Sequence, residues 1–79
     1  MRDTFVLTGP EQKVCAIILG TRDEIVMEAI KEDGCYKECK KVLITPDNIC
    51  DFQVQAICVT EDDEEEEVDY YLTAATLYQ

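Results

Sequence analysis

The sequence contains no histidine and no tryptophan, and it has seven basic residues against eighteen acidic ones. The lack of histidine removes the side chain that most often serves as a general base or metal ligand near neutral pH. Neither a glycine-rich phosphate loop nor a pattern of serine with histidine is present. Carboxylates are abundant, but a small acidic domain offers no obvious cleft that would raise the pKa of one of them. We therefore expect a protein that is not an enzyme and needs no cofactor.

Long apolar segments are also missing. No run is long enough to span a membrane. The N-terminus does not resemble a secretory signal, because its apolar run is only Phe5–Leu7 and charged residues follow from Glu11. A formal charge of -11 would be repelled by an anionic membrane surface. We expect a cytoplasmic protein without membrane contact.

The five cysteines do not form a recognisable framework. An odd count without a signal sequence argues against a secreted disulfide scaffold, and thiols stay reduced in a cytosol. Cys35 and Cys39 have a spacing that zinc sites use, but no second close pair completes a ligand set. Any calcium or magnesium binding by Glu64–Glu67 would be weak, because the glycine and spaced aspartates of an EF-hand loop are absent. We expect no metal site.

The first half of the chain predicts two strands and a helix. Thr4–Thr8 and Lys13–Leu19 read as strands of a hairpin, joined by a turn at Gly9. The second strand is almost continuously apolar, which is typical of a central strand or one covered on both faces. The helix is expected at 22–33, with Thr21 and Glu24 as a capping box and Gly34 just beyond its end.

The second half predicts three further strands. They are expected at 42–45, 52–60 and 68–78, and the last two should pair as an antiparallel hairpin. The order is ββαβββ in one domain that spans residues 1–79. The predicted fold class is α+β, with a mostly antiparallel sheet of about four or five strands and the helix on one face.

An acidic run stands between the two segments of that last hairpin. Eight carboxylates occupy nine positions: Glu61, Asp62, Asp63, Glu64, Glu65, Glu66, Glu67 and Asp69. Side chains on one face of a strand are about 6.6 Å apart, which is of the same order as the phosphate step along a nucleic-acid strand. Tyr71 should share a strand face with Glu67 and Asp69, and tyrosine is enriched at protein interfaces. We expect these residues to bind a partner.

The predicted helix carries a second acidic stripe. Glu24, Glu28 and Glu32 follow at intervals of four residues. Like charges at this spacing destabilise a helix by about 0.2–0.5 kcal/mol per pair, so the stripe indicates a basic partner. The basic residues are segregated, since none follows Lys41. This asymmetry favours binding to a basic cleft, to a second copy of the chain or to the chain's own acidic half.

In size, charge and compactness the chain resembles the small acidic inhibitors encoded by phages and mobile elements, including anti-CRISPR proteins and DNA mimics. The resemblance implies a non-enzymatic inhibitor that binds the basic nucleic-acid-binding site of a host protein, in the host cytoplasm if a phage encodes it. Direct nucleic-acid binding is disfavoured, because phosphates would meet net negative charge. The alternative is a structural or regulatory protein-interaction module, including a homodimer, in which the acidic run is only solubilising.

Overall fold

The computed structural model describes residues 4–48 and 51–75, which form one five-stranded antiparallel sheet and one α-helix. The strands lie in the order β2-β1-β5-β4-β3, so the first strand pairs with the last. The predicted α+β fold with a mostly antiparallel sheet and one helix is confirmed. The element bounds are β1 Thr4–Thr8, β2 Val14–Leu19, α1 Asp23–Gly34, β3 Glu38–Pro46, β4 Asp51–Val59 and β5 Glu65–Ala74, with a short 3-10 turn at Pro10–Gln12.

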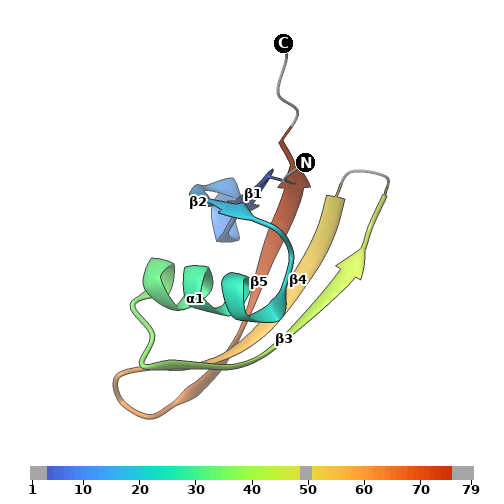
Figure 1. The fold of residues 1–79 in the computed structure, drawn as a ribbon. Coiled ribbons are helices and arrows are strands. Elements are labelled where there is room, and N and C mark those ends of the chain that lie inside the picture. Colours follow the sequence, from blue (N-terminus) through green and yellow to red (C-terminus); the bar gives the residue numbers. More distant parts are fainter. Residues whose placement is uncertain (1–3, 49–50, 76–79) are drawn as a thin grey trace.

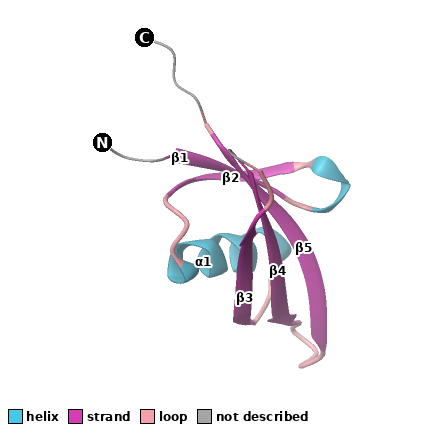
Figure 2. Cartoon of the chain, turned by 90° about the vertical axis from the view of Figure 1, so that its right-hand side faces the viewer, coloured by secondary structure: helices cyan, strands magenta, loops and turns pink. Residues whose placement is uncertain are grey.

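The helix covers only one face of the sheet. It runs across β3, β4 and β5, and it contacts β2 and β3, the two edge strands (Figure 1). In Figure 2 it lies to one side of β3, β4 and β5, and no described element covers the other side. We call the side toward α1 the covered face and the opposite side the open face. The described helices include none that is long and apolar enough to cross a membrane.

The core lies between the covered face and α1. Alternate residues of β1, β4 and β5 point into it, and they meet two side chains of the helix. Phe5 and Phe52 make an edge-to-face aromatic contact with ring centroids 5.9 Å apart. Each fully buried aliphatic side chain contributes about 1.5–3 kcal/mol through removal from water. The largest of these aliphatic residues are Leu7, Val26, Ile30, Val54 and Leu72.

β2 is an edge strand, so the prediction of a central or doubly covered strand is wrong. Its apolar run is real, but only Ile18 is buried. Val14, Ile17 and Leu19 are 62%, 70% and 52% exposed on the open face. The position of a strand in a sheet depends on its neighbours. Here β1 takes β5 as its second partner and leaves β2 outside.

The prediction of an N-terminal capping box is also wrong. The helix begins at Asp23, and Arg22 occupies the N-cap position without a side-chain hydrogen bond to the helix. The carbonyl oxygen of Arg22 accepts the first helical bond from the Val26 N–H, at 3.1 Å. Asp23 and Glu24 still place negative charge in the first turn, where the helix dipole favours it.

The C-terminus of α1 differs from the prediction by one residue. Gly34 is the last helical residue, and Cys35 takes the left-handed conformation with a φ of 54°. The Tyr36 N–H then donates to the Lys31 carbonyl at 3.0 Å, which closes the helix end. Gly34 is needed for a packing reason instead, since a Cβ atom there would overlap the ring of Tyr36.

β3 begins at Glu38, four residues before its predicted start. The prediction misses this part of the strand because a bulge interrupts the alternation of buried and exposed residues. The pairing with β4 shifts between Cys39 and Lys41, which leaves Lys40 as an extra residue. Cys39 and Val42 are both buried, and the two intervening lysines are both exposed. Regular alternation would have turned one lysine into the core. The bulge keeps both lysines exposed to solvent. It also breaks the period-two alternation by which the strand could be predicted from the sequence.

The last hairpin forms as predicted, with shifted ends. β4 ends at Val59, and β5 begins at Glu65 instead of Val68. Glutamate has a low strand preference, but pairing of 65–67 with 57–59 of β4 extends the ladder into the acidic run. The strand ends at Ala74 rather than Tyr78, and the predicted residues 76–78 lie outside the described part of the chain.

Candidate functional site

The tip of the β4–β5 hairpin is held by Thr60. Its backbone N–H donates to the Glu64 carbonyl at 2.8 Å, and its carbonyl accepts from the Asp63 N–H at 2.9 Å. Its hydroxyl oxygen accepts from the backbone N–H groups of Asp62 and Glu64, both at 3.2 Å. Asp63 takes a left-handed φ of 65°, which aspartate tolerates well. The first half of the acidic run is therefore an ordered turn, with Glu61 exposed at its start.

The second half of the run forms a column on the open face. Glu65, Glu67, Asp69 and Tyr71 are exposed, and they alternate with the more buried residues of β5. Glu66 points toward the covered face, because it pairs with the buried Cys58 and alternates with Glu65 and Glu67 along the strand. The predicted shared face of Glu67, Asp69 and Tyr71 is thus present in the strand. The hydroxyl of Tyr71 accepts a hydrogen bond from Gln53 Nε2 at 3.2 Å.

A shallow hollow lies beside this column. It has a volume of about 160 Å³ and lies where β3, β4 and β5 run side by side. Leu43 and Ile57 provide apolar surface, and Leu43 is 55% exposed. Glu67 and Asp69 line one side, while Lys41 lies across from Glu67 on the other side of Ile57. The hollow can therefore receive an aliphatic side chain that ends in a positive charge.

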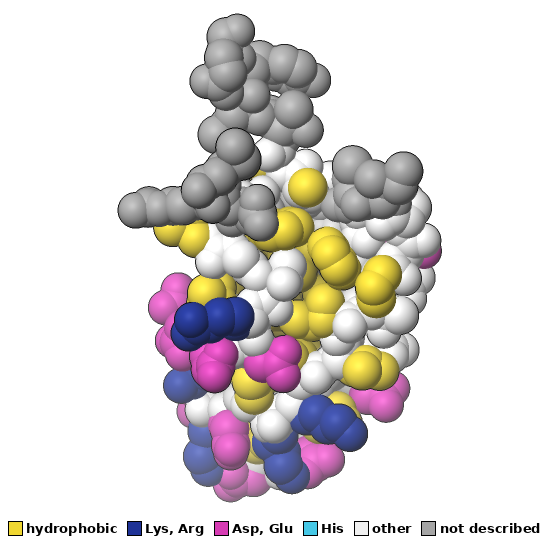
Figure 3. Space-filling view, turned by 45° about the vertical axis from the view of Figure 1, so that its right-hand side comes forward, with side chains coloured by type: hydrophobic (Ala, Val, Ile, Leu, Met, Phe, Trp, Pro, Cys, Tyr) yellow, Lys and Arg dark blue, Asp and Glu magenta, His cyan; other side chains and the backbone are white. Residues whose placement is uncertain are grey.

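Two lysines neutralise part of the acidic run. Lys37 pairs with Asp63, and Lys40 Nζ lies 2.6 Å from Glu65 Oε2. The ion pair with Glu65 raises the pKa of Lys40. Basic and acidic side chains intermix at the lower end of the view in Figure 3. Two of the segregated basic residues thus bind the acidic half within one molecule, one of the three options that the sequence left open.

The acidic stripe of the helix lies elsewhere. Glu24, Glu28 and Glu32 are exposed along α1, on the covered side of the sheet, and Glu24 makes an exposed 3.7 Å ion pair with Arg22. The carboxylate column of β5 faces the opposite side. The structure therefore separates the predicted partner-binding residues into two surfaces, and one flat partner surface cannot contact both.

A partly buried polar contact closes one end of the gap between α1 and β2. The hydroxyl of Tyr70 donates to Asp33 Oδ2 at 2.8 Å. Burial, and then this carboxylate, raise the pKa of Tyr70 well above its ordinary value. Burial and Asp33 also raise the pKa of the Cys15 thiol. A thiol shifted in this direction is protonated at neutral pH, so Cys15 is not an activated nucleophile.

The remaining described cysteines are free and do not converge on a metal. Cys35 is exposed, while Cys39 and Cys58 are buried opposite each other in the β3–β4 ladder. Burial, and then the neighbouring Cys39, raise the pKa of Cys58 to about 12. Residues 4–48 and 51–75 contain no group of three or more ligand-type side chains that could hold a metal ion. Cys50 lies outside the described residues.

Comparisons with known proteins give no match to this chain, whether with protein-family models, with curated proteins or with solved structures. Function must therefore be inferred from the residues themselves. Sequence reasoning did not identify the hollow at Leu43 or the exposed apolar residues of β2. The hollow depends on strand register, which no local pattern specifies. The apolar run of β2 is visible in the sequence, but its continuity predicts an interior strand instead of an exposed one.

Proposed function

We propose that this protein is a non-enzymatic inhibitor that occupies a basic nucleic-acid-binding surface on another protein. The observation that carries the proposal is the hollow on the open face, where apolar side chains adjoin Glu67 and Asp69. An arginine or lysine of the partner would place its aliphatic stem on Leu43 and Ile57 and its charge near the two carboxylates. Tyr71 follows Asp69 on the same strand face and extends the contact surface.

The ordered hairpin supports this interpretation over a loosely solvated acidic loop. Thr60 fixes the turn, and strand pairing fixes Glu65, Glu67 and Asp69 about 6.6 Å apart. A rigid array loses little conformational entropy on binding, so more of the electrostatic attraction remains as affinity. Basic surfaces that bind phosphates would be attracted to this array, with fast and salt-sensitive association. Nucleic acid itself would be repelled.

The internal ion pairs reduce the number of carboxylates that are free to bind a partner. Lys40 and Lys37 already contact Glu65 and Asp63, so the carboxylates available without competition are those farther along β5. Lys41 adds positive charge to the hollow and would oppose a basic side chain. Replacing it by glutamine should therefore strengthen partner binding. This substitution distinguishes a specific hollow from a diffuse acidic surface.

The test uses two variants with equal loss of charge. The column variant carries Glu65→Gln, Glu67→Gln and Asp69→Asn, and the helix variant replaces Glu24, Glu28 and Glu32 by glutamine. Each immobilised protein captures binders from nuclease-treated lysate of the source cells, at about 50 and 500 mM salt. A short duplex oligonucleotide is then added as competitor. The partner should be a nucleic-acid-binding protein that the oligonucleotide displaces.

The column variant should lose that partner, and the helix variant should keep it. A partner that the oligonucleotide does not displace would contradict the proposal, and so would one that the column variant binds as tightly as the wild type. A purified partner then allows a direct competition measurement, in which Lys41→Gln should raise the affinity.

A second candidate is self-association, with the acidic run only solubilising. The exposed apolar residues Val14, Ile17 and Leu19 on the open face favour this candidate. Sedimentation velocity across a concentration series tests it. A dimer that Ile17→Ser dissociates supports this candidate, while a monomer at every concentration excludes it.

A further inference from the structure

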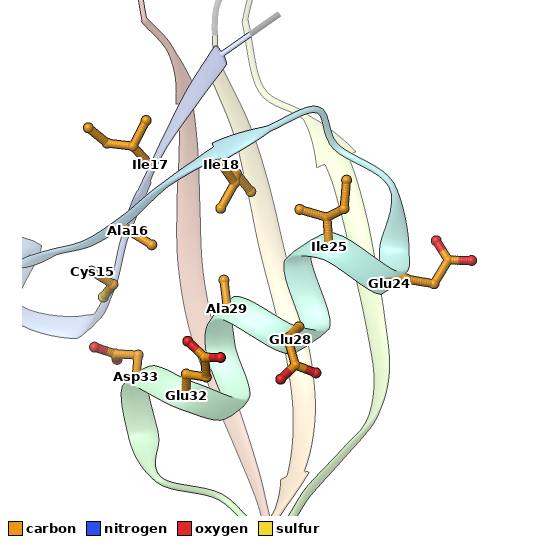
Figure 4. A pocket seen from close by; sticks show the side chains of 10 residues that line it. All are labelled: Cys15, Ala16, Ile17, Ile18, Glu24, Ile25, Glu28, Ala29, Glu32 and Asp33. Atoms are coloured by element: carbon orange, nitrogen blue, oxygen red, sulfur yellow. The ribbon is translucent and has the colours of Figure 1, made fainter.

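A groove runs between α1 and the edge strand β2. It has a volume of about 680 Å³, and its lining comes from these two elements alone. Ala16 and Ile18 of β2 and Ile25 and Ala29 of α1 provide an apolar floor. In Figure 4, Ile18 points down toward the helix while Ile25 and Ala29 point up toward the strand. The helix glutamates line the same groove.

The backbone edge of β2 beside this groove has no strand partner among the described residues. β2 pairs with β1 on one side only. In an antiparallel ladder, alternate residues of an edge strand direct their N–H and C=O groups outward. Proteins usually protect such an edge with charged side chains or proline. Val14–Leu19 contains neither, whereas the other edge strand, β3, carries lysines.

The spacing of the helix glutamates matches that of an added strand. Residues four apart on a helix are separated by about 6 Å along its axis. Alternate residues of a strand are separated by about 6.6 Å. Over Glu24, Glu28 and Glu32 the two repeats differ by only about 1 Å in total. A strand paired to β2 would therefore place every second side chain opposite one glutamate, and positive charge there would be complementary.

The other side of such a strand would face apolar surface. Its remaining side chains would lie on the open face beside Ile17 and Leu19, which are 70% and 52% exposed. The two faces of the edge thus impose an alternating pattern on the ligand. Basic residues are required on the α1 side, and apolar residues are favoured on the open side.

We propose that the β2 edge and its groove bind an extended segment of another protein, in which lysine or arginine alternates with apolar residues. The segment adds as a sixth strand next to β2, with its basic side chains over Glu24, Glu28 and Glu32. This site goes beyond the proposed function, because its groove lies on the opposite side of the sheet from the hollow at Glu67. It also explains why the helix keeps a stripe of like charges that weakens it.

A second copy of this chain does not fit the same edge. Pairing β2 with another β2 would bring two acidic helices side by side, in a protein with a formal charge of -11. No segment of the sequence has basic residues at alternate positions that could serve as the ligand instead. The occupant is therefore a different, basic chain.

The test uses a labelled peptide of about nine residues in which lysine alternates with valine. One control peptide has the same composition with the lysines in one block, and a second has N-methyl groups on alternate backbone amides. Binding is measured by fluorescence anisotropy at about 50 and 300 mM salt. Backbone hydrogen exchange of the complex reports which amides become protected.

The alternating peptide should bind at least about tenfold more tightly than either control, since only it can form a regular ladder. The outward amides of Val14–Leu19 should exchange at least about tenfold more slowly in its complex. The helix variant should weaken binding about tenfold through the loss of three ion pairs. The column variant removes the same charge from the opposite face and should bind as the wild type does.

Four results would overturn the proposal. They are equal binding of the block peptide, equal binding of the methylated peptide, protection at β5 instead of β2, and equal weakening by the two variants. None of these results bears on displacement of a partner by an oligonucleotide, so the two proposals can fail separately. Self-association of the wild type in place of peptide binding, with protection of β2, would assign the edge to a second copy.

Discussion

The hydroxyl of Tyr70 donates a 2.8 Å hydrogen bond to the carboxylate of Asp33, which joins the centre of β5 to the last turn of α1. Gly9 packs against the same tyrosine, and a Cβ atom at Gly9 would lie 3.0 Å from its ring and 2.9 Å from Cys15 Sγ. The helix, the last strand and the β1–β2 connection therefore meet at one side chain. This contact closes one end of the groove beside β2.

Removal of the Tyr70 hydroxyl should destabilise the fold. We expect Tyr70→Phe to lower the free energy of unfolding by about 1–2 kcal/mol, because the buried tyrosine loses its hydrogen bond to a partly exposed carboxylate. Urea denaturation measures the change. Tyr71→Phe is the matched control on the exposed face, where the loss should stay within about 0.5 kcal/mol. Equal losses in the two variants would contradict the role assigned to the Tyr70–Asp33 hydrogen bond.

Stability should fall at alkaline pH. The pKa of Cys58 is raised to about 12 in the folded protein, while an unfolded cysteine titrates near 8.5. The unfolded chain therefore loses this proton first, so the free energy of unfolding decreases as the pH rises from about 8.5 toward 12. Burial raises the pKa values of Tyr36 and Tyr70, which adds to the loss above about pH 10.

Urea titrations at several pH values between 7.5 and 10.5, under reducing conditions, measure this dependence. Cys58→Ala should be less stable at pH 7.5 because it leaves a small cavity. It should also show a shallower decline between pH 8.5 and 10. A wild-type stability that stays constant over the whole range would refute the prediction.

The hydroxyl of Thr60 should order the acidic turn. Thr60→Val keeps the shape but removes the acceptor for two backbone N–H groups, so we expect a loss of about 1 kcal/mol in stability. The amides of 61–64 should become more mobile on the nanosecond timescale, as measured by ¹⁵N relaxation. Thr60→Ser retains the acceptor and should leave both properties near the wild type. Unchanged relaxation in Thr60→Val would show that strand pairing alone orders the turn.

Thiol reactivity should follow burial. Cys35 is exposed and should react first with iodoacetamide under native, reducing conditions. Cys39 and Cys58 are buried, so their alkylation requires local or global opening and should be at least about a hundredfold slower. Peptide mapping by mass spectrometry resolves the three sites. Comparable rates at Cys35 and Cys58 would indicate that the β3–β4 ladder opens readily.

Local signals predicted the elements of this fold better than their positions in the sheet. The helix and the first strand follow from spacing and strand-forming residues, and their ends are correct to within one residue. The edge position of β2 could not be predicted, because it depends on the pairing of β1 with β5. The start of β3 was missed because the bulge at Lys40 interrupts the alternation. Each failure concerns information that lies in another part of the chain.

The candidate sites show the same difference between features that local sequence predicts and features that depend on distant parts of the chain. The acidic run was visible as sequence, and its place in the last hairpin followed from the flanking apolar segments. The sequence leaves open that the basic residues bind the chain's own acidic half, but it does not identify Lys37 and Lys40, since both ion pairs join residues far apart in the chain. The groove beside β2 could not be predicted, because it forms only where α1 and the edge strand lie side by side. A continuous apolar strand followed by an acidic helix is the only local sign of it.

The pairing of β1 with β5 also bears on how the chain folds during synthesis. Phe5 takes Ala74 as its partner, so the strand made first must wait for the strand made last. Contacts between such distant positions slow folding, because loop closure costs entropy before the contact forms. The β3–β5 meander is local and can form early. Until β5 emerges from the ribosome, the β1–β2 hairpin has both edges unpaired, and chaperones have an apolar strand to recognise during that interval.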